Sequence, residues 1–399
     1  MLYTQGKTEC SPSDIGYDEE RLEVLKNHFQ RGIDDKQIQC GIYCLSRRGK
    51  IFASGAVGKK SFREKDSSPA LPDSTRYIAS ITKVFTAVAI MKLAEDGILN
   101  IEDKVGSILP QFDTPPYNEI NLFHLLTHTS GMHADGGCFE NKYQSNYWDM
   151  IDKAYKLHDA KKDGEFDWIS AALGTIGTGL HAPIGSYWAY CSFGFIILGA
   201  VIEKLTGQSA EKYIEDIICK PLGMKDTTFD LTPDLAKRYI VTDKELEKYI
   251  NDTINGKYKP DWIGEKLGIP STGGGLNGTV YDLVRFGNMM LSGGALDGAR
   301  VLGRKSVERM TAQSILKPTY CWENNGDIVD FGIGFNRCRR SMFTFSENTF
   351  WHEGAGACAM YIDPAEEVVA VWITPFASND VWHKRIMFNT INIIWSGII

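Results

Sequence analysis

The sequence lacks any apolar run long enough to cross a membrane. No stretch of 18 consecutive apolar residues occurs, and residues 1–20 are polar with an acidic end, without the apolar core of a signal peptide. We therefore expect a soluble, cytoplasmic protein with no membrane partner.

An excess of basic residues is also missing. The 43 Lys and Arg residues are scattered along the chain and outnumbered by 50 Asp and Glu, which gives a net charge of −7. This balance argues against a nucleic-acid partner. A small molecule or a short peptide is the expected partner, and the sequence leaves the oligomeric state open.

Metal and cofactor motifs are absent as well. The cysteines contain no CxxC pair and are odd in number, so we expect buried free thiols rather than a zinc site or a disulfide framework. The nine are Cys10, Cys40, Cys44, Cys138, Cys191, Cys219, Cys321, Cys338 and Cys358. His124 and His128 have no third ligand nearby, and Gly273–Gly275 does not follow a strand in a nucleotide-binding pattern. No metal and no cofactor is expected.

The order of apolar patterns predicts an α+β fold. Helical spacing opens the chain at residues 18–29, and short strand-like runs follow at 41–45 and 51–57. More strands are expected after residue 330, at 332–338, 341–345, 357–362 and 368–374, before a last helix near 380–394. We predict one unit, 1–399, with an antiparallel sheet flanked by N- and C-terminal helices. Residues 1–77 and 266–399 would form the sheet lobe, and 78–265 an inserted, mainly helical lobe.

The strongest chemical signal is Ser80-Ile81-Thr82-Lys83, at the start of an apolar stretch that predicts a buried helix over 80–99. Residues three apart lie one turn apart on the same helix face, so the Lys83 amine can reach the Ser80 hydroxyl. Burial would lower the pKa of Lys83 and let it act as a base toward Ser80. The same spacing recurs at Ser209 and Ser314, but neither of these serines opens a buried helix.

Around this motif the chain resembles the serine β-lactamase and penicillin-binding-protein superfamily, in particular the branch with class C β-lactamases, D-stereospecific peptidases and related esterases. The resemblance extends from about residue 18 to the end. Its segments, in the family's order, are residues 77–97, 124–132, 183–207 and 271–287.

The resemblance implies that Tyr190 shuttles protons between Ser80 and the leaving group. The family's second motif is Tyr-x-Asn, and here Tyr190-Cys191-Ser192 occupies that position, with Ser192 as a substrate-binding residue in place of Asn. A literal Tyr-x-Asn begins at Tyr249, in a charged helix, and a purely structural role for Tyr190 in an aromatic segment stays open.

The third motif of the family, Lys-Thr-Gly or a variant, is matched by His352-Glu353-Gly354, ahead of a strand expected from Ala355 to Cys358. The resemblance implies that His352 and Gly354 contact substrate. It also implies that the backbone N–H groups of Ser80 and Ala355 form the oxyanion hole. A structural role for His352 is the alternative.

Taken together, these motifs predict a serine hydrolase that forms an acyl-enzyme on an ester or amide. His352 and Ser192 replace a lysine and an asparagine, which weakens recognition of a substrate carboxylate and of an acyl-side amide. A D-amino-acid peptidase or a β-lactamase is the alternative of the same class. A non-catalytic ligand-binding protein is the alternative of another class. Residues 134–182 contain no motif that we can interpret.

Overall fold

The structure is a computed structural model. It describes residues 1–135, 156, 167–175, 179–257, 268–315, 329–337, 343–355, 357–375 and 382–399. Most of the segment 134–182 therefore lies outside the described residues, as do Cys138, Cys321 and Cys338.

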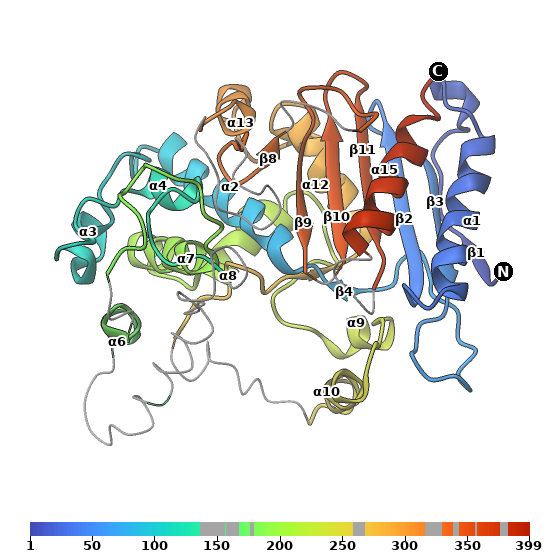
Figure 1. The fold of residues 1–399 in the computed structure, drawn as a ribbon, viewed down its shortest axis with the longest axis horizontal. Coiled ribbons are helices and arrows are strands. Elements are labelled where there is room, and N and C mark those ends of the chain that lie inside the picture. The colour runs from blue at the N-terminus through green and yellow to red at the C-terminus, as the bar shows by residue number, and fades with distance from the viewer. Residues whose placement is uncertain are drawn as a thin grey trace.

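A seven-stranded sheet, antiparallel at every pairing, forms one half of the molecule (Figure 1). In spatial order its strands are β1 (Tyr3–Gln5), β3 (Lys50–Gly58), β2 (Cys40–Arg47), β11 (Val368–Ile373), β10 (Cys358–Asp363), β9 (Phe350–Gly354) and β8 (Asn336–Arg337). N-terminal and C-terminal strands meet where β2 pairs with β11, so the two ends of the chain build one sheet. Its last two strands, β9 and β8, form the edge nearest the helical part.

Both faces of the sheet are covered, and the strand sequences reflect this. Every residue of β2, β10 and β11 is buried. On β11, Val369, Val371 and Ile373 enter one apolar core, whereas Val368, Ala370 and Trp372 enter the other. Successive side chains of a strand point to opposite faces of the sheet. Because the side chains on both faces of β11 are apolar, each face must be covered by helices.

The outer face is covered by α1 (Glu20–Asp34) and α15 (Phe388–Trp395), which pack on each other (Figure 1). The inner face carries α12 (Val280–Leu291), which packs against β2, β10 and β11. Sequence prediction of flanking N- and C-terminal helices around an antiparallel sheet is confirmed.

The other half of the molecule is mainly helical (Figure 1). Its elements between β4 and β5 are η2 (Ala79–Ile81), α2 (Thr82–Glu95), α3 (Val105–Ile108), η3 (Pro110–Phe112), α4 (Leu122–Leu126), α6 (Trp168–Thr175), α7 (Ser192–Thr206), α8 (Ala210–Ile214), η5 (Glu215–Cys219), α9 (Pro233–Lys237) and α10 (Lys244–Ile254). The remaining short elements are η1 (Ser13–Ile15), β4 (Arg76–Tyr77), β5 (Asn277–Gly278), β6 (Ala295–Leu296), β7 (Ala299–Arg300), α13 (Arg304–Thr311) and η6 (Trp382–Met387). The lobe boundary predicted between residues 77 and 78 stays a prediction. The boundary predicted between residues 265 and 266 lies outside the described residues.

Four local predictions were wrong. Of the strand expected at 332–338, the described residues form only β8 (Asn336–Arg337), because the chain bends at residues 333–334. The helix expected from Ser80 begins at Thr82, because Ser80 lies in the tighter turn η2 that precedes it. Residues 343–345, expected as part of a strand, form a bend. The strand expected from Ala355 begins only at Cys358, because β9 ends at Gly354 and the chain turns there.

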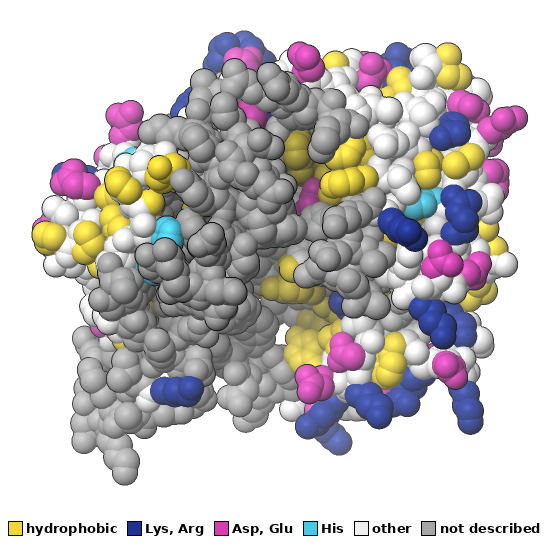
Figure 2. Space-filling view, viewed as in Figure 1, with side chains coloured by type: hydrophobic (Ala, Val, Ile, Leu, Met, Phe, Trp, Pro, Cys, Tyr) yellow, Lys and Arg dark blue, Asp and Glu magenta, His cyan; other side chains and the backbone are white. Residues whose placement is uncertain are grey.

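Each described helix falls short of the length and apolarity that crossing a bilayer requires. Acidic and basic side chains alternate over the described part of the face in Figure 2, without a field of one sign. The described cysteines are all free thiols, and all except Cys10 are buried.

The close contact between α12 and the sheet predicts that a larger side chain at this contact destabilises the fold. A Cβ added at Gly287 would lie 2.4 Å from Cγ1 of Val369, a buried residue of β11. We expect Gly287→Ala to lower the free energy of unfolding by about 1–3 kcal/mol, because the core must shift to admit the methyl group. Urea unfolding followed by circular dichroism measures this.

Gly174, in helix α6, provides the matched control, since a Cβ there meets nothing within 4 Å. Gly174→Ala should leave the stability unchanged or raise it slightly. Equal losses in the two variants would contradict the packing described for α12.

Candidate active site

Ser80 lies where the helical part meets the sheet. The short strand β4 pairs with β5 and leads the chain into η2, where Ser80 is partly exposed. The preceding residue, Ala79, has a φ of +47°, a left-handed conformation that costs a non-glycine residue energy. Ile78 anchors this strained turn by donating its N–H to the carbonyl of Leu276 at 2.9 Å.

Lys83 follows in the first turn of α2, and its side chain has no exposed surface. Its Nζ lies 3.0 Å from Oγ of Ser80 and donates to the carbonyl oxygen of Gly273 at 2.6 Å. Burial lowers the pKa of Lys83 to about 8, against the opposing effect of Asp135. Once the amine is neutral, the Ser80 hydroxyl can donate to its lone pair and pass it a proton, as nucleophile activation requires.

Tyr190 lies on the other side of Lys83, in the loop before α7. The Nζ atom of Lys83 is 4.9 Å from the centroid of the Tyr190 ring and 5.8 Å from that of Phe195. Aromatic faces stabilise the ammonium form at such distances. Tyr249, the tyrosine of the literal Tyr-x-Asn sequence, lies in α10 and belongs to a separate apolar cluster between α10 and α9. Of the two tyrosines, Tyr190 is therefore the one placed beside Ser80 and Lys83.

Ser192, the first residue of α7, faces a carboxylate that no sequence motif marks. Asp135 accepts the backbone N–H of Ser192 at 2.8 Å and its hydroxyl at 2.5 Å. The Asp135 N–H in turn donates to the carbonyl of Tyr190 at 2.8 Å. Burial raises the pKa of Asp135, while Lys83 and the two Ser192 donors oppose the rise. No motif marks Asp135, because its partners lie more than 50 residues further along the chain.

His352 lies on β9, at the side of the site that the sheet forms. Its ring is buried and 6.3 Å from that of Tyr190, measured between centroids. Burial lowers the pKa of His352 to about 3, with Lys83 acting in the same direction. The ring is thus neutral at pH 7. Its Nδ1 lies 2.7 Å from the carbonyl oxygen of Glu353, which can only accept, so Nδ1 carries the hydrogen.

The two ring nitrogens of neutral His352 therefore differ in role, Nδ1 being a hydrogen-bond donor and Nε2 an acceptor. Nε2 of His352 has a lone pair and no proton, and no described residue bonds to it. Where the resembled family has a cationic lysine, this chain presents a neutral hydrogen-bond acceptor.

Gly354 and Ala355 lie against the serine turn. A Cβ at Gly354 would approach the carbonyl oxygen of Ile78 to 2.2 Å, so only glycine permits this contact between β9 and the segment before Ser80. Ala355 follows in the turn after β9 and is exposed.

His128 is structural in its contacts, as its sequence context indicated. It is buried, it accepts the backbone N–H of Cys191 on Nδ1 at 3.0 Å, and its ring packs on Tyr190 at 4.5 Å between centroids. His124 forms a capping box at the start of α4 with Asn121. Within the described ranges no group of three or more His, Cys, Asp or Glu side chains is placed to hold a metal ion.

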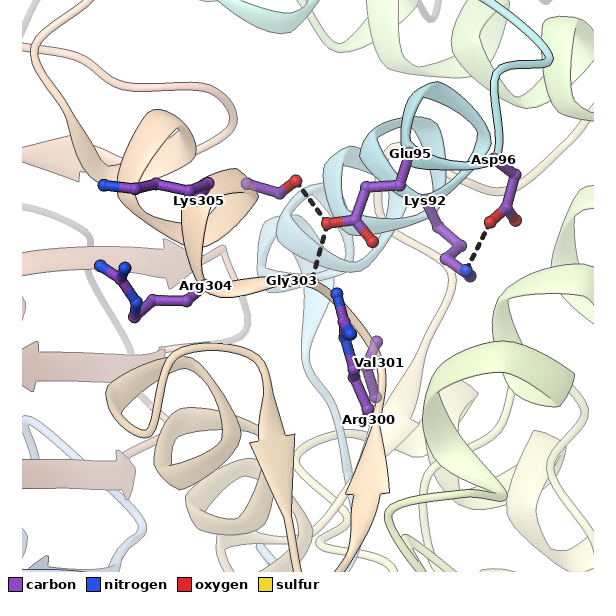
Figure 3. A pocket seen from close by; sticks show the side chains of 9 residues that line it. Lys92, Glu95, Asp96, Arg300, Val301, Gly303, Arg304 and Lys305 are labelled. Carbon is purple, nitrogen blue, oxygen red and sulfur yellow. Dashed lines mark hydrogen bonds and ion pairs between the residues drawn. The ribbon is translucent and has the colours of Figure 1, made fainter.

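A cavity of about 610 Å³ opens at the opposite end of α2, away from Ser80 (Figure 3). Glu95, Lys92 and Asp96 are each bonded to neighbouring residues that also line it. Glu95 accepts the N–H of Gly303 at 2.6 Å and the hydroxyl of Ser306, and Lys92 pairs with Asp96 at 2.7 Å. Because α2 runs 14 residues, about 20 Å separate this cavity from the serine.

Comparison with known proteins gives one family over most of the chain. Residues 25–381 match the family model Beta-lactamase. A Salmonella typhimurium protein named "Putative D-alanyl-D-alanine carboxypeptidase" is 25% identical over 392 residues, covering 91% of this chain and 84% of its own length.

Solved structures share the fold at lower identity. A penicillin-binding protein homologue from Caulobacter crescentus has a TM-score of 0.69 and 18% identity, covering 95% of this chain and 97% of its own. EstCE1, described as "a hydrolase with promiscuous acyltransferase activity", has a TM-score of 0.71 and 17% identity, covering 95% and 99%.

The burial of Lys83 predicts a measurable link between pH and stability. Its pKa is lowered from 10.5 to about 8 in the folded chain, so below pH 8 folding must bury a charge. That costs about 3 kcal/mol, and the cost disappears as the pH rises from 8 to 10.5. Lys83→Met should thus be more stable relative to wild type at pH 7 than at pH 10.

Urea unfolding of both proteins at the two pH values measures this difference. A gap of a few kcal/mol at pH 7 that shrinks by pH 10 is expected. A gap that does not change with pH would mean that Lys83 titrates normally in the folded protein.

Proposed function

The chain belongs to the β-lactamase family of serine hydrolases, and from that premise we propose that it cleaves an ester or amide through an acyl-enzyme on Ser80. The contact of 3.0 Å between Oγ of Ser80 and Nζ of the buried Lys83 carries this proposal. A serine hydroxyl is a weak nucleophile until a nearby base removes its proton.

In the proposed mechanism Ser80 attacks the substrate carbonyl as its proton passes to neutral Lys83. The N–H groups of Ser80 and Ala355 stabilise the tetrahedral oxyanion, and each donor of this kind contributes about 3–4 kcal/mol. Tyr190 donates its phenol proton to the leaving group and recovers one from Lys83, so the leaving group departs protonated and the acyl group stays on Ser80. Water then attacks the acyl carbonyl as its proton passes to neutral Lys83, and Ser80 recovers a proton as the acid departs. None of these steps requires a cofactor.

The neutral state of His352 favours a substrate without a carboxylate at this position. The unprotonated Nε2 would repel a carboxylate, whereas a lysine would attract it. The carboxylate of Asp135, which acts electrostatically on Lys83, adds a negative charge to the site. We therefore favour a carboxylesterase or amidase over a penicillin-cleaving enzyme.

A D-amino-acid peptidase or a β-lactamase is the second candidate. The name of the Salmonella relative, at 25% identity, supports it. A non-catalytic binding protein is the third candidate, and it is disfavoured because Ser80, Lys83 and Tyr190 retain close contact.

Turnover separates these candidates. We expect wild type to hydrolyse p-nitrophenyl butyrate faster than a chromogenic cephalosporin or D-alanyl-p-nitroanilide, and Ser80→Ala to lose at least a thousandfold of the esterase rate. Faster release from either of the last two substrates would favour the second candidate. No Ser80-dependent release from any of them would favour the third.

The role of His352 can be tested by restoring a charge. His352→Lys should improve acylation by benzylpenicillin relative to the ester by about tenfold to a hundredfold, since a charge-assisted hydrogen bond contributes about 1.5–3 kcal/mol. His352→Met, similar in length but uncharged, is the control. Equal ratios in the two variants would count against a carboxylate-selecting role at this position. Mass spectrometry of the acylated protein measures the rates.

A further inference from the structure

Hydrogen bonds join the triplet Tyr190-Cys191-Ser192 to residues 128–135. Its carbonyl at Tyr190 accepts the N–H of Asp135 at 2.8 Å, and its N–H at Cys191 donates to Nδ1 of His128 at 3.0 Å. The third member, Ser192, gives both its N–H and its hydroxyl to the carboxylate of Asp135.

Asp135 therefore holds both ends of the triplet. Its backbone fixes the carbonyl of Tyr190, and its two carboxylate oxygens fix Ser192 two residues further on. Such a clamp limits rotation of the backbone that carries the Tyr190 ring. The position of that ring over Lys83, at 4.9 Å from Nζ, depends on this backbone.

Asp135 also brings a charge to the nucleophile. Besides the ring faces of Tyr190 and Phe195, the groups that act electrostatically on Lys83 include Asp135, Cys191, His128 and His352. Burial raises the pKa of the Cys191 thiol to about 12 and lowers the pKa of both histidines, so these three are neutral at pH 7. Among the described residues, Asp135 is thus the carboxylate counter-ion of Lys83.

We propose that Asp135 is a positioning residue, which holds Tyr190 against Lys83 and stabilises the ammonium group formed when Lys83 takes the proton of Ser80. The inference rests on the proposed function, because it concerns that same proton transfer. The proton leaves Oγ of Ser80, joins Nζ of Lys83 and is balanced by the carboxylate of Asp135.

Asp135→Asn separates charge from geometry. The amide oxygen still accepts the N–H of Ser192, and the amide NH₂ can donate to the Ser192 hydroxyl, which is also an acceptor. Without the negative charge the pKa of Lys83 falls further. The acid limb of kcat/KM for p-nitrophenyl butyrate, expected near pH 8 in wild type, should then move about one unit lower.

Ser192→Ala is the matched control, because it removes one hydrogen bond to Asp135 and keeps the charge. Its limiting rate should fall while its acid limb stays at the wild-type pH. An unshifted acid limb in Asp135→Asn, or an equal shift in Ser192→Ala, would overturn the proposal.

A second readout is independent of turnover. In protein labelled with ¹³C at lysine Cε, with Lys83 assigned by Lys83→Arg, the Lys83 signal should titrate at lower pH in Asp135→Asn than in wild type. An unchanged titration would refute the charge coupling even if no ester is hydrolysed. Absence of Ser80-dependent turnover together with a shifted titration would reject the proposed function and keep the electrostatic pair.

If Asp135→Asn does not fold, the same coupling can be measured from the side of Lys83. Coupling between two titrating groups acts equally on both, so removing the Lys83 charge must raise the pKa of Asp135. In Lys83→Met, ¹³C-carboxyl NMR should show Asp135 titrating at higher pH than in wild type. The same titration in both proteins would refute the coupling.

Discussion

The burial of one amine, that of Lys83, is the constraint on which the rest of the site depends. An ammonium group in the core is costly unless it is neutralised, hydrogen-bonded or paired. The chain uses all three means: burial lowers the pKa of Lys83 to about 8, Gly273 accepts a hydrogen bond from it, and Asp135 lies within electrostatic reach. The result is an amine that can exist neutral next to a serine hydroxyl.

Segments far apart in the sequence converge around this amine because of the fold. The turn η2 and the start of α2 hold Ser80 and Lys83 close together, α7 begins at the Tyr190 triplet, and β9 ends at Gly354 against the serine turn. The sheet that supports β9 needs strands from both ends of the chain. Stability of the sheet and geometry of the site are therefore linked through the contact between β9 and η2.

The sequence was sufficient for the parts of the structure that follow from local patterns. Apolar residues at periods of 2 and 3.6 identified α1 and the strands β2, β3 and β11, and the Ser80 motif stood out by its apolar surroundings. The start of α2 was missed because a tight turn and a helix share the same apolar pattern, and the left-handed Ala79 has no sequence signal. The strand predicted from Ala355 was wrong for a similar reason, because small residues in a turn have the same sequence pattern as small residues in a strand.

Asp135 was missed for a different reason. A carboxylate acquires its role here from partners at Tyr190, Ser192 and Lys83, which only the tertiary structure brings together. The placement of Tyr190 rather than Tyr249 beside Lys83 likewise depends on the packing of α7 against α2. Motif order indicated the right tyrosine, but no local pattern distinguished the two.

Covalent labelling by a fluorophosphonate tests the central claim most directly, because the reagent reacts with an activated serine hydroxyl. Intact-protein mass spectrometry followed by peptide mapping gives both the stoichiometry and the position of the adduct. The account predicts one adduct per chain, on Ser80, with labelling that slows sharply when Lys83 is replaced by Met. No adduct, an adduct on another serine, or unchanged labelling without Lys83 would contradict it.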